Sequence, residues 1–163
     1  METVARDEGA EIDLLVKRVA DGTVVIPKNI KRTLPSPRGI GLGLRTKVNA
    51  NIGTSSDYAD IEDEIQKLQV ALDAGADAVM DLSTGGSLGR IRERMLEHCP
   101  VPLGTVPIYE VAVKVAAERG AITQITPDDL LDAIVRQAEQ GVDFMTVHCG
   151  ITRESIERLR DQG

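Results

Sequence analysis

The sequence predicts an α/β protein: the first half of a TIM-type (β/α)8 barrel, with about four parallel β/α units behind a short helical segment. Short apolar runs alternate with amphipathic runs of helical length, an order that requires right-handed crossovers and a parallel sheet. The final helical run stops after about two turns, which favours a barrel interrupted midway. A small, open, doubly wound sheet of the same units is the alternative.

Residues 1–43 are predicted to precede the barrel as an N-terminal helix, a short strand and a linker. The run 11–22 is amphipathic and ends at Gly22, and its apolar positions follow helical spacing: Ile12, Leu15, Val16 and Val19. "TVVI" at 23–26 is a short β-rich run. Three prolines and three glycines between Pro27 and Gly43 are typical of a linker.

Residues 44–163 then repeat a strand–loop–helix rhythm, which predicts the half barrel. The predicted strands are 47–52, 76–82, 101–108 and 142–148. The predicted helices are 60–75, 88–99, 109–120, 126–141 and 152–163. The helix over 126–141 has the clearest start, with Thr126 as N-cap and Pro127 at the first helical position.

Composition narrows the functional classes. The chain has 163 residues, 42% hydrophobic and 28% charged, which is typical of a soluble domain with a packed core. A formal net charge of -7 argues against a nucleic-acid partner. The sequence has no apolar run of the roughly 20 residues that a membrane helix needs, and its N-terminus does not resemble a secretory signal. Two distant cysteines, Cys99 and Cys149, indicate reduced thiols in a cytoplasmic protein.

The strand "KVNANI" at 47–52 has two different faces. Because side chains alternate along a strand, one face carries Lys47, Asn49 and Asn51. The other carries Val48, Ala50 and Ile52 and is predicted to pack in the core. Lys47 lies roughly 13 Å deeper along the strand than Asn51, so we expect it low in the barrel or paired with an acid rather than acting as a Schiff-base lysine.

Polar or polarisable residues are predicted at the carboxyl ends of the four strands, where ligands bind in parallel α/β folds. These positions carry Asn51, Met80 (or Asp81), Tyr109 and His148. Two successive intervals of 29 residues separate Asn51, Met80 and Tyr109, and a step of 39 leads to His148. The longer step accommodates an extra loop and helical turn around "GAITQITP". The four residues are therefore predicted to surround one cavity.

Each feature also has a structural interpretation. A strand histidine such as His148 is often part of the framework, and Met80 is suited to filling a core. His98 at a helix C-terminus is most simply a favourable partner of the helix dipole. The loops "NIGTSS" and "LSTGGS" are rich in residues that expose backbone N–H groups to anions, but such loops are common and specify no ligand alone.

Four motifs taken together resemble the phosphomethylpyrimidine synthase (ThiC) family of thiamine biosynthesis. They are "GLRTKVNANIGTSSD", "GADAVMDLSTGG", "CPVPLGTVPIYE" and "QAEQGVDFMTVHCGIT". The match runs in order from "GTVVIPKN" to the last residue. The close relative 5-hydroxybenzimidazole synthase, of anaerobic cobamide biosynthesis, shares the motifs and remains an alternative.

The resemblance implies a radical S-adenosylmethionine lyase. Its members convert 5-aminoimidazole ribonucleotide to hydroxymethylpyrimidine phosphate with S-adenosylmethionine and a [4Fe-4S] cluster, and are cytoplasmic homodimers. The family's substrate contacts map onto Asn51, Met80, Tyr109 and His148. The resemblance thus implies a small-molecule substrate and assigns no catalytic residue in this chain.

The sequence also departs from the family pattern. The family carries a C-terminal Cys-x-x-Cys-x-x-x-x-Cys for the cluster and two later histidines for zinc or a similar divalent metal, and this sequence contains neither. We therefore expect the chain to be the N-terminal part of such an enzyme and inactive alone. A non-catalytic half barrel that binds a nucleotide or a partner is the alternative.

Overall fold

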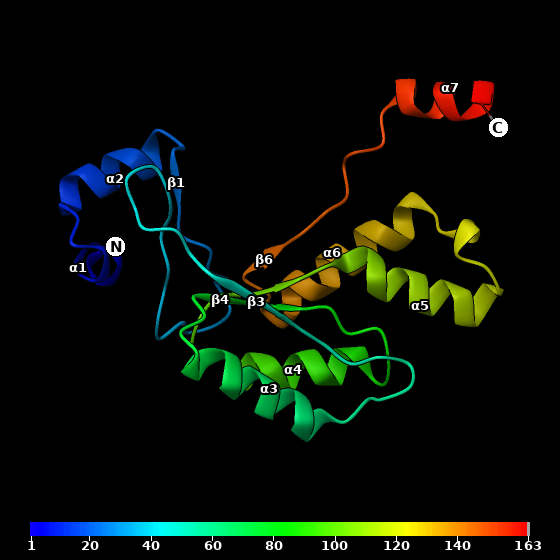
Figure 1. The fold of residues 1–163 in the computed structure, drawn as a ribbon, viewed down its shortest axis with the longest axis horizontal. Helices are drawn as coiled ribbons and strands as arrows, with labels where there is room; N and C mark the ends of the chain where they lie inside the picture. The colour runs from blue at the N-terminus through cyan, green and yellow to red at the C-terminus, as the bar shows by residue number, and fades with distance from the viewer. Residues whose placement is uncertain (163) are drawn as a thin grey trace.

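The computed structural model describes residues 1–162, and its elements alternate between strands and helices after a helical N-terminus (Figure 1). The helices are α1 (Glu2–Glu8), α2 (Ile12–Ala20), α3 (Ile61–Asp73), α4 (Leu88–His98), α5 (Pro107–Arg119), the 3-10 turn η1 (Ile122–Gln124), α6 (Pro127–Gln140) and α7 (Arg153–Gln162). The strands are β1 (Val24–Val25), β2 (Ile40–Gly41), β3 (Asn49–Ile52), β4 (Ala78–Asp81), β5 (Leu103–Thr105) and β6 (Phe144–Met145).

The main sheet has four parallel strands in the order β3-β4-β5-β6, so each strand pairs with the next one along the chain. The predicted parallel α/β architecture is confirmed at this level, although every strand is shorter than the sequence pattern suggested. The register aligns one residue from each strand in a row: Asn51, Met80, Gly104 and Phe144.

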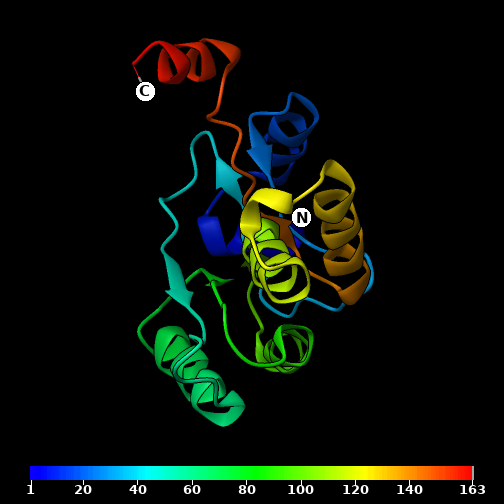
Figure 2. The same ribbon diagram turned by 90° about the vertical axis from the view of Figure 1, so that its right-hand side faces the viewer.

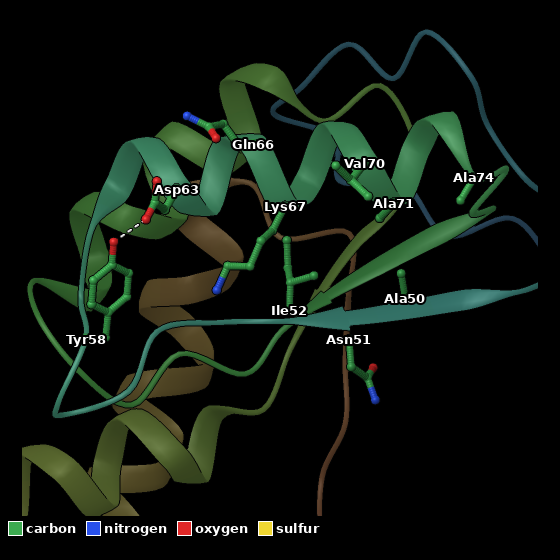
Figure 3. A pocket seen from close by; sticks show the side chains of 10 residues that line it. All are labelled: Ala50, Asn51, Ile52, Tyr58, Asp63, Gln66, Lys67, Val70, Ala71 and Ala74. Atoms are coloured by element: carbon green, nitrogen blue, oxygen red, sulfur yellow. Dashed lines mark hydrogen bonds between the residues drawn. The ribbon is translucent and has the colours of Figure 1, made fainter.

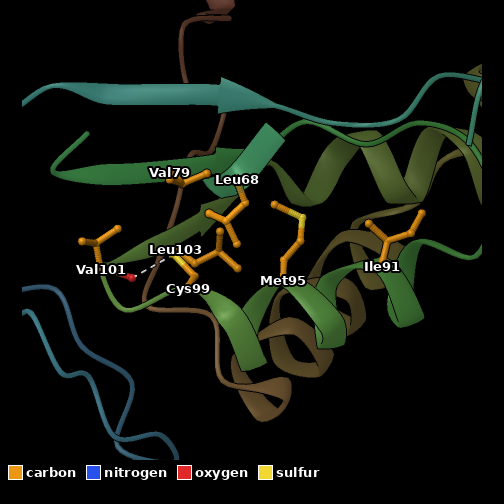
Figure 4. Packing of buried hydrophobic residues seen from close by; sticks show 7 residues of the cluster. All are labelled: Leu68, Val79, Ile91, Met95, Cys99, Val101 and Leu103. Carbon is orange, nitrogen blue, oxygen red and sulfur yellow. Dashed lines mark hydrogen bonds between the residues drawn. The ribbon is translucent and has the colours of Figure 1, made fainter. Parts of the chain in front are cut away.

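The helices α3, α4 and α6 pack on one face of this sheet (Figure 2). The central core joins α3, α4, β4 and β5 through Leu68, Val79, Met95 and Leu103, each at most 1% exposed (Figure 4). Ala50 and Ile52 of β3 pack against it, whereas Val48, predicted on the same buried face, is 61% exposed because it precedes the paired part of the strand. A doubly wound sheet would instead carry helices on both faces.

Two aspartates fix the amino ends of the strands. Asp77, just before β4, accepts hydrogen bonds from the backbone N–H of Val48 (3.0 Å) and from Arg38 (3.0 Å). Asp143, just before β6, accepts them from the N–H groups of Leu103 (2.9 Å) and Asn29 (2.8 Å). Each carboxylate therefore joins the start of a neighbouring strand to the segment that precedes the sheet.

The N-terminal region is more structured than predicted. The helix α1 precedes the predicted helix, and β2 lies within the predicted linker and pairs antiparallel with β1. Only Leu15 of the expected apolar stripe on α2 is buried; the other three positions are at least 37% exposed: Ile12, Val16 and Val19. The core of this region is instead shared among α1, α2 and β1.

The boundary between β5 and α5 differs from the prediction. β5 ends at Thr105 and α5 begins at Pro107, the first helical position after Val106. Proline is favoured there because its fixed φ fits a first helical turn and its missing N–H costs nothing. The predicted helix α6 is confirmed with its N-cap, since Thr126 and Asp129 form a reciprocal capping box.

The C-terminal helix α7 stands apart from the sheet at the end of an extended segment, as Figure 1 shows. Its apolar residues Ile156 and Leu159 are 43% and 72% exposed. Among residues 1–162, no helix combines the length and apolar character required to cross a membrane.

Candidate functional site

Asn51 and Met80 lie side by side on the sheet face that points away from α3 and α4. The register pairs them directly, and the neighbouring residues Ile52 and Asp81 face the opposite way, toward the helices. Asn49, two residues earlier on the same face of β3, orients the Asn51 side chain by donating a hydrogen bond from its Nδ2 to the Asn51 Oδ1 (2.8 Å). The predicted choice between Met80 and Asp81 is thus decided by alternation, and Met80 faces the candidate site.

Tyr109 and His148 form a second pair beyond the ends of β5 and β6. Their ring centroids are 6.2 Å apart with the ring planes at 34°. Tyr109, predicted as the first residue of a helix that directly follows a strand, lies in the first turn of α5. His148, predicted as the last residue of a strand, follows β6 by three residues. The early start of α5 at Pro107 accounts for the Tyr109 placement.

Thr146 contacts the first pair and lines a small cavity with His148 of the second. It lies on the same side of the last strand as Phe144, and its Oγ1 is 3.8 Å from the Met80 Sδ, within the range of a weak hydrogen bond to sulfur. Alternation in "VDFMTVH" predicts Phe144, Thr146 and His148 on one face, so this face was recognisable from the sequence. The close approach of Thr146 to Met80 was not recognisable, because it depends on the register of strands far apart in the chain.

Lys47, at the lower end of the same face, is paired as expected. Its Nζ lies 2.7 Å from the Glu8 Oε1, and its side chain is only 6% exposed. Burial tends to raise the pKa of the Glu8 carboxyl, but the hydrogen bond from Lys47 and the N–H of Arg45 hold that pKa below its usual value. This ion pair gives Lys47 a structural role at the base of the sheet.

A buried polar network supports the site from the helix side of the sheet. Glu110 of α5 accepts hydrogen bonds from Arg92 (2.5 Å), Gln137 (2.6 Å) and Arg136 (2.9 Å). Burial tends to raise the pKa of the Glu110 carboxyl, yet these three donors hold it below its usual value. Thr105, at the end of β5, donates a hydrogen bond to Gln137 (2.7 Å). The network therefore anchors the first turn of α5, where Tyr109 sits.

Asp81, directly after Met80 on β4, is a buried carboxyl on the helix side of the sheet. Burial raises its pKa, and hydrogen bonds from the backbone N–H and side chain of Ser83 oppose the rise.

His98, on α4, places its Nδ1 2.8 Å from the Arg94 carbonyl at the helix C-terminus. That position agrees with the structural interpretation of His98.

The two Gly- and Ser-rich loops after β3 and β4 pack against each other. The N–H of Thr54 donates to the Ser83 Oγ (3.1 Å), and the Thr54 Oγ1 donates to the Gly85 carbonyl (2.7 Å). A Cβ at Gly85 would overlap the backbone of Ser55, so glycine is required at this approach. Several polar groups of the loops are therefore used to hold the carboxyl ends of β3 and β4 together.

A cavity of about 690 Å³ lies elsewhere, between the open edge of β3 and α3 (Figure 3). Its walls include Ile52, Tyr58, Lys67 and Val70, and Tyr58 donates a hydrogen bond to Asp63 at its rim. In Figure 3 the Asn51 side chain points away from α3. The cavity therefore lies along the unpaired edge of the sheet, and its walls do not include Met80, Tyr109 or His148.

The described residues do not fit an iron–sulfur cluster. Cys99 is buried and donates a hydrogen bond to the Val101 carbonyl (3.3 Å), while Cys149 is exposed. Within residues 1–162, no group of three or more His, Cys, Asp or Glu side chains is arranged to hold a metal ion. A cluster requires three or four thiolates at one site, and this chain has two cysteines in all.

The chain is similar over its whole length to proteins named phosphomethylpyrimidine synthase. It is 56% identical over 163 residues to that of Desulforudis audaxviator (strain MP104C) and 55% identical over 163 residues to that of Moorella thermoacetica (strain ATCC 39073 / JCM 9320). With the protein of Thermodesulfovibrio yellowstonii (strain ATCC 51303 / DSM 11347 / YP87), identity is 52% over 157 residues.

These alignments cover 100% of this chain for the first two relatives and 96% for the third. The chain spans only 37–38% of the length of those relatives. The model of the family described as "Radical SAM ThiC family" matches residues 1–163. This chain therefore belongs to the radical SAM ThiC family.

Proposed function

We propose that this chain supplies the substrate-binding half barrel of an enzyme that converts 5-aminoimidazole ribonucleotide to hydroxymethylpyrimidine phosphate in thiamine biosynthesis. The observation that carries the proposal is the family match over the whole chain, together with relatives named for the pyrimidine product. The chain spans only 38% of the length of the first of those relatives. We therefore assign the complete reaction to a protein of the relatives' full length, and substrate binding to the part that this chain matches.

The site residues have chemistry suited to this substrate. The amide of Asn51 and the imidazole of His148 offer hydrogen bonds to polar ring or ribose groups, and the Tyr109 hydroxyl is suited to orienting the ribose. The Met80 thioether is suited to packing against a flat ring. Such contacts hold a reactive species in one orientation and exclude groups that would quench it.

The architecture supports a half (β/α)8 barrel over residues 44–163, preceded by the segment 1–43. The strands follow one another in chain order, and α3, α4 and α6 lie on one face, as in a barrel where helices form the outer ring. The site residues then face the barrel axis near its carboxyl end, where such barrels bind substrate. Closure requires further strands beside β3 and β6.

The cofactor proposal is that the [4Fe-4S] cluster and any divalent metal, such as zinc, are held by sequence other than this chain. Two cysteines and the absence of a metal-binding group within residues 1–162 support that assignment. When bound, the cluster would supply the electron for reductive cleavage of S-adenosylmethionine, and the residues of this chain would bind and orient the substrate. We further propose a cytoplasmic homodimer, as the resemblance to the family implies.

Isothermal titration of 5-aminoimidazole ribonucleotide into the chain tests the proposed function. We expect saturable binding that weakens at least tenfold in Asn51→Ala and His148→Ala. Asp57→Asn, in the exposed loop after β3, is the control and should bind as the unsubstituted chain does. Binding that is equally strong in all variants would move the site away from this face.

A further inference from the structure

Gly104 and Phe144, which are not among the four predicted site residues, pair with each other in the row of residues across the sheet. Asn51, Met80, Gly104 and Phe144 lie at one level on β3, β4, β5 and β6. Gly104 has no side chain, and the ring of Phe144 occupies the space that a side chain there would fill. A Cβ added at Gly104 would overlap three ring atoms of Phe144. Glycine on β5 therefore lets the neighbouring ring lie across that strand.

The Phe144 ring is placed beside the site rather than in the core. Phe144 is half-buried and lines a cavity of about 530 Å³ with Met80, Asn49 and Ala78 of the same sheet face. Residues of the segment 40–47, which precedes β3, form the rest of the wall. Two positions further along, Thr146 reaches the Met80 sulfur. The ring and the thioether thus form an adjoining apolar surface, with the Asn51 amide at one end of the row.

We infer that Phe144 and Gly104 form an aromatic subsite that selects a planar heterocycle, an inference that rests on the proposed function. Aromatic side chains stack on planar bases and tolerate differences in their polar edges, while thioethers make favourable contacts with ring edges. The subsite would recognise the imidazole ring of the ribonucleotide, and the pairs at Asn51 and Tyr109–His148 would read its polar groups. The Phe144 face would not contribute to recognition of the sugar phosphate.

The test uses the fact that Phe144 is the only phenylalanine in the chain. Selective labelling of phenylalanine with ring ¹³C gives NMR signals from this one ring. The labelled chain is titrated with 5-aminoimidazole ribonucleotide and, separately, with ribose 5-phosphate, which lacks the heterocycle. We expect the Phe144 ring signals to shift with the nucleotide and to stay in place with ribose 5-phosphate.

Three variants measure the contribution by calorimetry. Phe144→Leu keeps apolar bulk but removes the ring, and Gly104→Ala displaces the ring while leaving Phe144 in the chain. Each should weaken nucleotide binding about tenfold, which corresponds to about 1.4 kcal/mol, and leave ribose 5-phosphate binding unchanged. Phe144→Tyr keeps the ring and should keep the affinity. Met145→Leu, on the helix side of β6, is the matched control.

The outcomes separate the subsite from the proposed function. The subsite alone is overturned if the chain binds the nucleotide but the Phe144 ring signals do not shift and Phe144→Leu and Gly104→Ala bind as tightly as the unsubstituted chain. Equal ring shifts with ribose 5-phosphate also overturn it. If the unsubstituted chain binds neither compound, the proposed function fails on this face and the subsite fails with it. Melting temperatures of all variants identify any that do not fold, and the Phe144 ring signals of the unsubstituted chain then decide between the outcomes.

Discussion

Adjacent residues on β3 have opposite roles, which makes this strand the clearest case at the scale of single residues. Asn51 is exposed on the candidate site face, whereas Ile52 is half-buried against the helix-side core. Removing the exposed amide should change the free energy of unfolding by less than about 0.5 kcal/mol. Removing three carbons from Ile52 should cost about 1–3 kcal/mol, less than a fully buried isoleucine.

The prediction is that Asn51→Ala lowers substrate affinity with little loss of stability, and that Ile52→Ala does the reverse. Urea denaturation gives the stability of each variant, and calorimetry gives its affinity for 5-aminoimidazole ribonucleotide. Equal losses of stability with equal affinities would contradict the assignment of the two faces.

Local alternation predicted the residue-scale features that depend on one strand. The placement of Asn51 and Met80 and the pairing of Lys47 with an acid followed from position along their strands. The missed features depend on neighbouring strands: the Phe144 ring over Gly104, and Thr146 beside Met80. The sequence pattern also began the helix of Tyr109 two residues too late, because it did not weigh Pro107 as a helix start.

At the scale of secondary-structure elements, Asp77 ties β3, β4 and the preceding segment together. Its side chain is 2% exposed and accepts hydrogen bonds from Arg38, Arg45 and the N–H of Val48. Asp77→Asn should lower the free energy of unfolding by about 2–3 kcal/mol, because the guanidinium groups lose their charged acceptor. Asp57→Asn, at an exposed position, is the matched control, and a comparable loss there would show that the effect is not specific to Asp77.

The same carboxylate predicts a pH dependence. Burial tends to raise the pKa of Asp77, but Arg45, the N–H of Val48 and Arg38 hold it below its usual value. A lowered pKa in the folded state means that the stabilisation is complete above the unfolded pKa of about 4 and is lost as the pH falls through the folded value. Urea titrations between pH 6 and pH 3 should show this loss in the unsubstituted chain. Asp77→Asn should show a shallower decline, and parallel curves would contradict the assignment.

The elements themselves were largely predictable because each has a local signal. Thr126 and Pro127 mark the start of α6, and strand–helix alternation marks the four parallel units. The hairpin of β1 and β2 was not predictable, since β2 is two residues long within a segment rich in proline and glycine. The exposed stripe on α2 arises because the core of that region also draws on α1 and β1.

At the scale of the whole molecule, an open parallel sheet predicts self-association. The strands β3 and β6 are the edges of the four-stranded sheet, and unpaired strand edges are sites of association. Size-exclusion chromatography with light scattering at moderate salt should give a mass above the 17.6 kDa of one chain. A single 17.6 kDa species at all concentrations would favour a self-contained open sheet.

Cofactor loading is a second whole-molecule prediction. With only two cysteines, Cys99 buried and Cys149 exposed, the chain should bind no [4Fe-4S] cluster after anaerobic reconstitution. Iron quantitation and an absorbance scan measure the outcome. Stoichiometric iron with cluster absorbance, or formation of deoxyadenosine from S-adenosylmethionine, would contradict it.

A chimaera tests our proposal that this chain supplies the substrate-binding part of a phosphomethylpyrimidine synthase. The chain replaces the matching 38% of the Desulforudis audaxviator relative, to which it is 56% identical over 163 residues. The reconstituted chimaera is incubated with 5-aminoimidazole ribonucleotide and S-adenosylmethionine, and products are identified by mass spectrometry. The account predicts hydroxymethylpyrimidine phosphate, with turnover at least tenfold lower in the Asn51→Ala chimaera. A folded, cluster-loaded chimaera that forms 5-hydroxybenzimidazole, or whose turnover is unaffected by Asn51→Ala, would contradict it.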